Sequence, residues 1–157
     1  MQTEQLTGHD VFELLRPDQI RTISETAEEL LLKAGDTVFR RGERADDFYI
    51  VLKGQVALRF PTREGLNLLI DEVGRGAIFG SCVCFQIDRY TLTAQCTEDS
   101  KLLKIPAAAL KQLLDDDPVL GYAVQTMISR AYFKRYIDTA QKLQAVLRIM
   151  PVDTVEA

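Results

Sequence analysis

The sequence predicts an α+β fold in which an antiparallel β sandwich or jelly roll lies between N-terminal helices and a long C-terminal helix. Three observations lead to this prediction. Residues 29–105 hold roughly eight short β-like runs that are separated by glycine turns. No helical pattern interrupts these runs, whereas both flanks carry apolar residues at helical spacing. Short, evenly spaced strands without intervening helices favour an antiparallel arrangement over a parallel sheet.

Residues 1–28 are predicted to form a helical segment that is too short to be a domain. Within it, Pro17 lies near the start of a helix, where proline is well tolerated. The apolar residues of this helix follow helical spacing at Ile20, Ile23 and Ala27.

The predicted strand region is punctuated by glycine and proline. Within FYIVLKGQVALRF, Gly54 interrupts two apolar runs, and we expect it to supply a positive φ or a bulge that lets the runs pair as a hairpin. Pro61 and Gly65 mark the next turn.

Residues 106–157 are predicted to be helical, with a short helix followed by one that begins at Pro118, runs for about thirty residues and stops before Pro151. The long helix carries two apolar stripes. The first is wide, is expected to pack on the strands, and contains Leu120, Val124, Met127, Ile128 and Ala131. The second is a narrow heptad seam that predicts a homodimer through Phe133, Tyr136, Ala140, Leu143 and Leu147. The alternative is that this seam folds back on its own barrel.

Composition limits the possible functions. The chain has 157 residues, of which 46% are hydrophobic, so one domain is expected. The opening MQTEQLTGHD is polar and lacks the basic and apolar regions of a signal peptide, and no run approaches the roughly 18 apolar residues of a membrane span, so we expect a soluble protein that is not exported. Three cysteines, an odd number, favour reduced thiols and a cytoplasmic location. The net charge of −4 argues against direct nucleic-acid binding.

The order of these elements over residues 9–148 resembles the cyclic-nucleotide-binding domain of the catabolite-activator and protein-kinase regulatory-subunit families. LLKAGDTVFRRGERADDFYIVLKGQVAL looks like the opening strands of that family, and GRGAIFG leads into a turn at residues 76–96 that is similar to its phosphate-binding cassette. The resemblance implies a β jelly roll (a double-stranded β-helix), a non-catalytic regulatory role, and a small ligand whose binding is signalled through the C-terminal helix to an effector protein. Because the chain ends at Ala157, we expect no DNA-binding domain after that helix.

In that family, backbone N–H groups of the cassette face the cyclic phosphate, a glutamate accepts from the ribose, and an arginine about nine residues later neutralises the phosphate. Here FGSC places Ser81 at the glutamate position, which weakens the sugar anchor. The resemblance makes candidate ligand-binding residues of Phe79, Gly80, Ser81, Cys82, Val83, Arg89, Tyr90 and Thr91.

Which residue takes the arginine position depends on strand register. Tyr90, Leu92, Ala94 and Cys96 share one parity and are mostly apolar, so they should face the barrel interior. In a regular strand Tyr90 then faces the pocket and Arg89 faces solvent, whereas a bulge would reverse the two. Replacement cations, if any, would come from Arg59, Arg130 or Lys134. No cofactor is expected, and cyclic AMP and cyclic GMP remain uncertain ligands.

Three alternatives stay open at this stage. A degenerate domain would serve only in dimerisation or docking, with its pocket plugged by Tyr90 and Phe85. A redox or haem sensor would use Cys82 and Cys84, but the single histidine, His9, and three cysteines make a poor metal-ligand set. A metal-dependent jelly-roll enzyme needs two or three histidines, so catalysis and a metal site are not expected.

Overall fold

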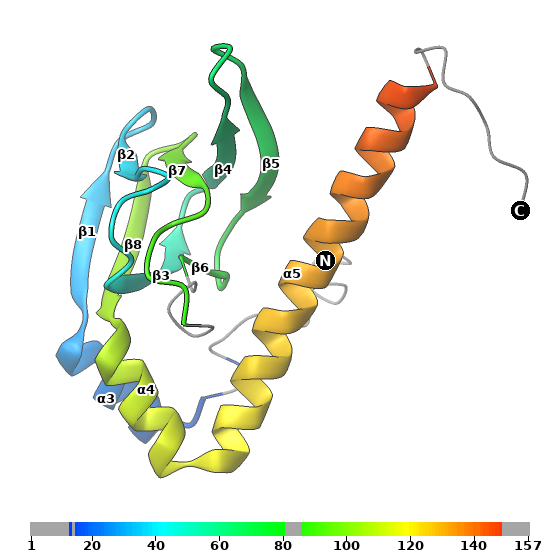
Figure 1. Cartoon of the computed structure of the whole chain (residues 1–157). Helices are drawn as coiled ribbons and strands as arrows, with labels where there is room; N and C mark the ends of the chain where they lie inside the picture. Colours follow the sequence, from blue (N-terminus) through cyan, green and yellow to red (C-terminus); the bar gives the residue numbers. More distant parts are fainter. Residues whose placement is uncertain (1–12, 14, 81–85, 149–157) are drawn as a thin grey trace, which may run out of the picture.

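The computed structural model describes residues 13, 15–80 and 86–148 (Figure 1). These residues form an α+β fold with two antiparallel sheets and flanking helices, as predicted. The elements, in chain order, are α3 (Pro17–Thr26), β1 (Glu28–Leu32), β2 (Thr37–Phe39), β3 (Asp47–Lys53), β4 (Val56–Pro61), β5 (Asn67–Val73), β6 (Ile78–Phe79), β7 (Thr93–Cys96), β8 (Ser100–Pro106), α4 (Ala107–Asp116) and α5 (Pro118–Leu147).

The strands form two four-stranded sheets, in the orders β1-β8-β3-β6 and β2-β7-β4-β5. Every pairing between these strands is antiparallel. The first helix is shorter than predicted, because Ala27 already has extended backbone angles and Glu28 belongs to β1. The preceding stretch DVFELL lies mostly outside the described residues, although Glu13 is helical.

Strand β3 divides the apolar core into two layers because successive side chains of a strand point to opposite faces. Tyr49 and Val51 pack between the two sheets, whereas Phe48 and Ile50 pack under the helices. The helical layer receives four buried residues of the first predicted stripe of α5, namely Leu120, Val124, Met127 and Ile128. The prediction that this stripe packs on the strands is confirmed.

The predicted hairpin across Gly54 is wrong. Strand β3 pairs with β6 and β8, while β4 pairs with β5 and β7, so the turn at Gly54 carries the chain from one sheet to the other. Gly54 does have the expected positive φ, at 97°. A hairpin occurs instead between β4 and β5, where the predicted turn contains Gly65.

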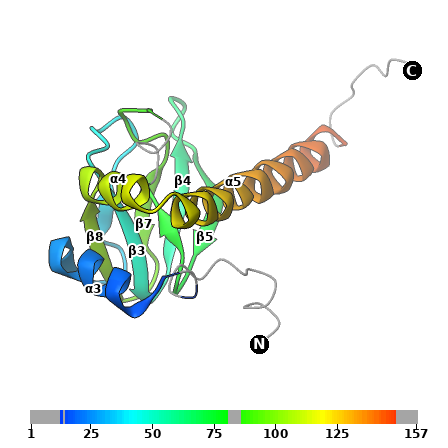
Figure 2. The ribbon, with the colours of Figure 1, turned by 90° about the horizontal axis from the view of Figure 1, so that it is seen from below.

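Helix α5 begins where the sequence predicts. Pro118 is its first residue, and the carboxylate of Asp117 accepts a hydrogen bond from the Leu120 backbone N–H at 3.1 Å, which caps the helix. The helix runs for 30 residues and ends at Leu147, while Pro151 lies outside the described residues. Figure 2 shows the C-terminal end of α5 extending past the sheets. Arg135 and Lys142, in the second half of the helix, still contact β5.

The predicted heptad seam, in the second half of α5, is exposed to solvent. The side chains of Phe133 and Leu143 are 64% and 58% exposed, and Tyr136, Ala140 and Leu147 are also exposed. The alternative in which the seam folds back on its own barrel is therefore wrong.

Candidate ligand-binding site

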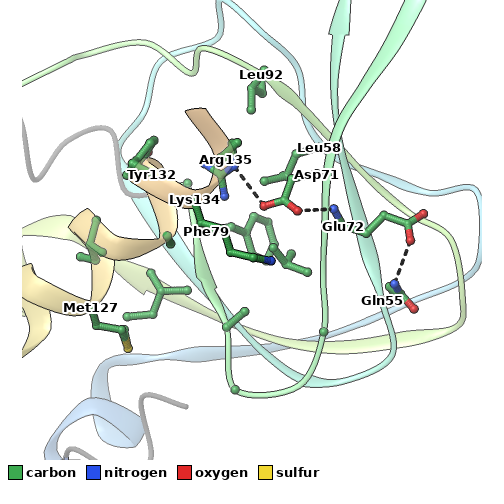
Figure 3. Close-up of a pocket in the computed structure, with 18 of the residues that line it drawn as sticks. Gln55, Leu58, Asp71, Glu72, Phe79, Leu92, Met127, Tyr132, Lys134 and Arg135 are labelled. Atoms are coloured by element: carbon green, nitrogen blue, oxygen red, sulfur yellow. Dashed lines mark hydrogen bonds and ion pairs between the residues drawn. The ribbon is translucent and has the colours of Figure 1, made fainter. Parts of the chain in front are cut away.

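A cavity of about 750 Å³ lies between the strands and α5 (Figure 3). A cavity of this volume suits an organic molecule of a few rings. Buried apolar side chains of the sheets form one wall, and the inward stripe of α5 forms the other. The sheet side contains Phe39, Leu58, Val73 and Phe79, and the helix side contains Met127, Ile128, Ala131 and Tyr132.

The described part of the predicted cassette borders this cavity. Phe79 ends β6 and is buried, and Gly80 follows with a φ of 74°. A Cβ atom on Gly80 would lie 3.1 Å from Phe39 Cε2 and 3.3 Å from Tyr49 Cδ1, so the packing as well as the backbone favours glycine here. The remaining predicted residues of the turn, Ser81, Cys82 and Val83, lie outside the described residues, as do Cys84 and Phe85.

Tyr90 is buried and Arg89 is exposed, as parity predicts, but the expectation that Tyr90 faces the pocket is wrong, because Tyr90 is not among the described residues that line the cavity. Tyr90 is 5% exposed, and its ring stacks on Phe39 with the ring centroids 3.7 Å apart. Its hydroxyl donates to the Asp47 carbonyl oxygen at 2.6 Å. Burial raises the pKa of the Tyr90 phenol above its ordinary value, so the group stays neutral and protonated.

The exposed Arg89 guanidinium is directed to the neighbouring loop, where Nη1 donates to the Gly42 carbonyl oxygen at 2.8 Å. Thr91 borders the cavity, but Arg89 and Tyr90 are not among the described residues that line it. Tyr90 instead packs in an aromatic cluster with Phe39, Tyr49 and Phe79, of which Phe39 and Phe79 border the cavity. Neither residue supplies the cavity with the cation that a cyclic phosphate requires.

One ion pair joins the two walls of the cavity. Arg135 Nε of α5 lies 3.1 Å from Asp71 Oδ2 of β5, and these side chains are 12% and 30% exposed (Figure 3). Asp71 Oδ1 accepts from the Glu72 backbone N–H at 2.9 Å, so both carboxylate oxygens are engaged. The Arg135 guanidinium also lies 5.0 Å from the centroid of the Tyr132 ring.

Sequence reasoning missed Asp71 and Arg135. A signal for Arg135 was present, because it continues the inward stripe four residues after Ala131, where a cation on an apolar face is unusual. Nothing in the local pattern around Asp71 indicated its partner, which is 64 residues away. Of the three cations that were considered, Lys134 borders the cavity, whereas Arg59 and Arg130 are not among its described lining residues.

Cysteine and metal chemistry find little support in the described residues. Cys96 is buried in the core between the sheets, and burial raises the pKa of its thiol, which makes it a weak nucleophile. No group of three or more histidine, cysteine or acidic side chains in the described ranges is arranged to hold a metal ion. A search of the same residues finds no helix with the length and apolar character needed to span a membrane.

Comparison with solved structures identifies several with the same architecture. The sensor domain of the transcriptional regulator DNR from Pseudomonas aeruginosa is 25% identical, with a TM-score of 0.70, and the match covers 99% of this chain and 96% of that one. The N-terminal domain of a transcriptional regulator from Streptomyces coelicolor A3(2) is 26% identical, with a TM-score of 0.63, over 80% of this chain and 89% of that one.

Curated relatives match over part of their length. The patatin-like phospholipase domain-containing protein 7 of Rattus norvegicus is 30% identical over 94 residues, which is 60% of this chain and 7% of that protein. The CRP-like cAMP-activated global transcriptional regulator of Mycobacterium tuberculosis is 23% identical over 127 residues, which is 81% of this chain and 57% of that protein. The chain thus spans well under two thirds of the length of either relative.

The family model described as the cyclic nucleotide-binding domain matches residues 29–117. This range starts in β1 and ends directly after α4, so it takes in both sheets that surround the cavity. Because it also includes more than half of the 157 residues, the chain belongs to the cyclic nucleotide-binding domain family.

Proposed function

We propose that this chain is a non-catalytic regulatory module that binds a small ligand between its jelly roll and α5 and signals occupancy through α5. The observation that carries the proposal is the cavity of about 750 Å³, whose opposite walls come from the sheets and from the long helix. A ligand that touches both walls binds more tightly to one position of α5 against the sheets than to other positions. This difference in affinity couples ligand binding to the conformation of α5. The sensor domain from Pseudomonas aeruginosa, which matches nearly the whole chain, supports a sensing role.

The alternative of a docking-only domain predicted a pocket plugged by Tyr90 and Phe85. Phe85 lies outside the described residues, and Tyr90 stacks on Phe39 but is not among the described residues that line the cavity. The position of Tyr90 therefore favours ligand binding over docking alone.

A block of the cavity tests the proposal. Ala131 borders the cavity, so the indole of Ala131→Trp is expected to enter it and displace a ligand. The probe is the neutral fluorophore N-phenyl-1-naphthylamine, whose emission rises in apolar surroundings. We expect wild-type protein to bind about one equivalent per chain, and Ala131→Trp to weaken binding by about tenfold or more, because the block removes the apolar contacts that carry the affinity.

The matched control is Thr139→Trp, which adds the same ring to an exposed position of α5 that does not border the cavity. Fluorescence titration of all three proteins gives the comparison, and denaturant unfolding shows whether each variant is folded. Equal binding by Ala131→Trp and Thr139→Trp, or no binding by the wild type, would refute ligand binding in this cavity.

Cyclic AMP and cyclic GMP are expected to bind weakly. The family's phosphate anchor is an arginine, and here Arg89 points away from the cavity while Tyr90 is not among the described residues that line it. Losing one charged hydrogen bond costs about 1.5–3 kcal/mol, or about ten- to a hundredfold in affinity. Calorimetric titration should therefore show no binding of either nucleotide at micromolar concentration. Tight binding of cyclic AMP that Arg89→Ala abolishes would contradict this expectation.

We propose further that the module acts as a homodimer through the seam of Phe133, Tyr136, Ala140, Leu143 and Leu147. The seam and the cavity-facing stripe lie on different sides of α5, as the exposure of Phe133 and the ion pair of Arg135 indicate. One helix would then contact the ligand on one side and the partner subunit on the other.

A further inference from the structure

The position of Arg135 raises the question of what its guanidinium binds besides Asp71. Arg135 continues the stripe of α5 that borders the cavity, and its side chain is 12% exposed. The other two cations that border the cavity, Arg75 and Lys134, are exposed. Arginine offers five donors in a planar fork that matches carboxylate, sulfonate and phosphate groups. Arg135 is therefore the well-buried cation of the described cavity wall.

The hydrogen bonds of the ion pair are unequal. Asp71 uses both carboxylate oxygens, one toward Arg135 Nε and one toward the Glu72 backbone N–H. Arg135, by contrast, hydrogen bonds to the described residues through Nε alone, so neither terminal amino group has a partner among them. Within the described ranges, the terminal amino groups of Arg135 therefore keep donors for a ligand, whereas each Asp71 oxygen already accepts one hydrogen bond. This difference favours an anion over a cation as the ligand of the pair.

The surroundings of Arg135 determine what else the ligand must carry. Figure 3 shows Arg135 at one side of a cavity whose labelled apolar residues are Leu58, Phe79, Leu92 and Met127. Glu72 also borders the cavity, where its carboxylate accepts a hydrogen bond from Gln55 Nε2 at 3.0 Å. Apolar walls favour binding of a ligand with an apolar body, because its surface is removed from water. They also lower the local dielectric constant, which strengthens a charged hydrogen bond between Arg135 and the ligand. Tyr132 lies against the guanidinium and limits its orientation.

We propose that Arg135 is the anion-binding residue of this cavity and selects organic anions in which a carboxylate or sulfonate group is attached to an apolar body. This inference rests on the proposed function, since it specifies the ligand of the same cavity. The anion takes the terminal amino groups of Arg135 and competes with Asp71 for the guanidinium. The cation that holds the ligand is then supplied by α5 rather than by the strand that follows the cassette.

Two probes that differ by one sulfonate group test the inference. The anion 1-anilinonaphthalene-8-sulfonate and neutral N-phenyl-1-naphthylamine share one ring system, and both report binding by fluorescence. For Arg135→Gln we expect the sulfonate to bind about ten- to a hundredfold more weakly, because a charged hydrogen bond is lost. The neutral probe should bind within about twofold of wild type, since the apolar walls are unchanged.

Asp71→Asn separates anion binding from a purely structural role of the ion pair. If Arg135 binds the anion, removing its competitor should strengthen sulfonate binding, whereas Arg135→Gln weakens it. If the pair only holds α5 against β5, both substitutions should change both probes in the same direction. Opposite effects on the sulfonate support the proposal, and parallel effects overturn it.

Arg130→Gln is the matched control, because it removes the same charge from an exposed position on α5 that borders the groove beside Phe133 rather than the cavity. Wild-type affinity for the sulfonate in this variant supports the proposal. Weaker sulfonate binding by Arg130→Gln than by Arg135→Gln would place the probe in the groove beside Phe133 and would overturn the proposal. If both probes bind and no variant changes their relative affinities, Arg135 is not the anion-binding residue, but ligand binding in the cavity is still supported. If neither probe binds, the proposed function is refuted as well.

Discussion

Replacing Tyr90 with alanine is expected to lower the free energy of unfolding by about 3–5 kcal/mol, the range for removing a large buried aromatic side chain. The substitution removes the stacking on Phe39 and leaves the Asp47 carbonyl without its hydroxyl donor. Because a domain of this size has a total stability of about 5–15 kcal/mol, a large share of it depends on this one residue. Urea unfolding followed by circular dichroism measures the change.

The adjacent residue provides the control. Arg89→Ala should change the unfolding free energy by about 0.5 kcal/mol or less, because the side chain is exposed and makes one hydrogen bond to a loop carbonyl. Tyr90→Phe should fall between the two, at about 1 kcal/mol, since it keeps the stacking and loses the hydroxyl. A larger loss for Arg89→Ala than for Tyr90→Ala would show that the register of this segment is reversed.

The burial of Tyr90 and the exposure of Arg89 were predictable, because the alternation of apolar and polar residues along a segment is a local property of the sequence. From Tyr90 to Cys96, apolar and polar residues alternate, and only one parity can face a packed core. The start of α5 was predictable for a similar reason, as Pro118 and the acidic residue before it mark a helix start without reference to the rest of the chain.

The error at Gly54 has a physical cause of another kind. A glycine between two apolar runs is compatible with a hairpin and also with a turn that passes between two packed sheets, because both need the same positive φ. The pairing of β3 with β8, about fifty residues along the chain, decides between them, and no local pattern reports it. Strand existence is therefore easier to predict than strand partnership.

The candidate site likewise contains residues that could be predicted from the sequence and residues that could not. Phe79, Gly80 and Thr91 were predicted from the resemblance and do border the cavity. Asp71 and Arg135 were not predicted, because the ion pair joins a strand to a helix over 64 residues of sequence. Such a pair becomes visible only when the packing of α5 on the sheets is known, and it supplies the cavity with a charge that the predicted cassette lacks.

The two faces of α5 have separate roles in this interpretation. On one side, Arg135 pairs with Asp71, and Lys142 Nζ lies 3.5 Å from the Leu69 carbonyl oxygen, so the helix stays beside β5. On the other side, Phe133 and Tyr136 form an exposed aromatic pair with ring centroids 6.2 Å apart. Exposed aromatic and aliphatic residues in a continuous stripe are typical of an interface.

Leu143→Glu is therefore expected to convert a homodimer into a monomer. The residue is 58% exposed in the single chain and lies at a central position of the seam, where a partner helix would bury it. Truncating a side chain at the centre of an interface makes the free energy of association less favourable by about 2–4 kcal/mol, which raises the dissociation constant of the dimer by about thirtyfold to a thousandfold. Burial of the new carboxylate would weaken the dimer further. Sedimentation velocity at micromolar concentration measures the result.

Gln141→Glu is the matched control for this experiment, because it adds the same charge to an exposed position of α5 that is not three or four residues from any seam residue. It should leave the dimer intact. Neither substituted position is buried in the single chain, so neither substitution is expected to change the stability of the folded monomer by more than about 0.5 kcal/mol. Loss of the dimer in Gln141→Glu alone would move the interface to another face of the helix. A wild-type protein that is monomeric at micromolar concentration, both with and without the sulfonate probe bound, would refute the dimer and remove α5 as a route between subunits, because coupling between two cavities requires that the subunits touch.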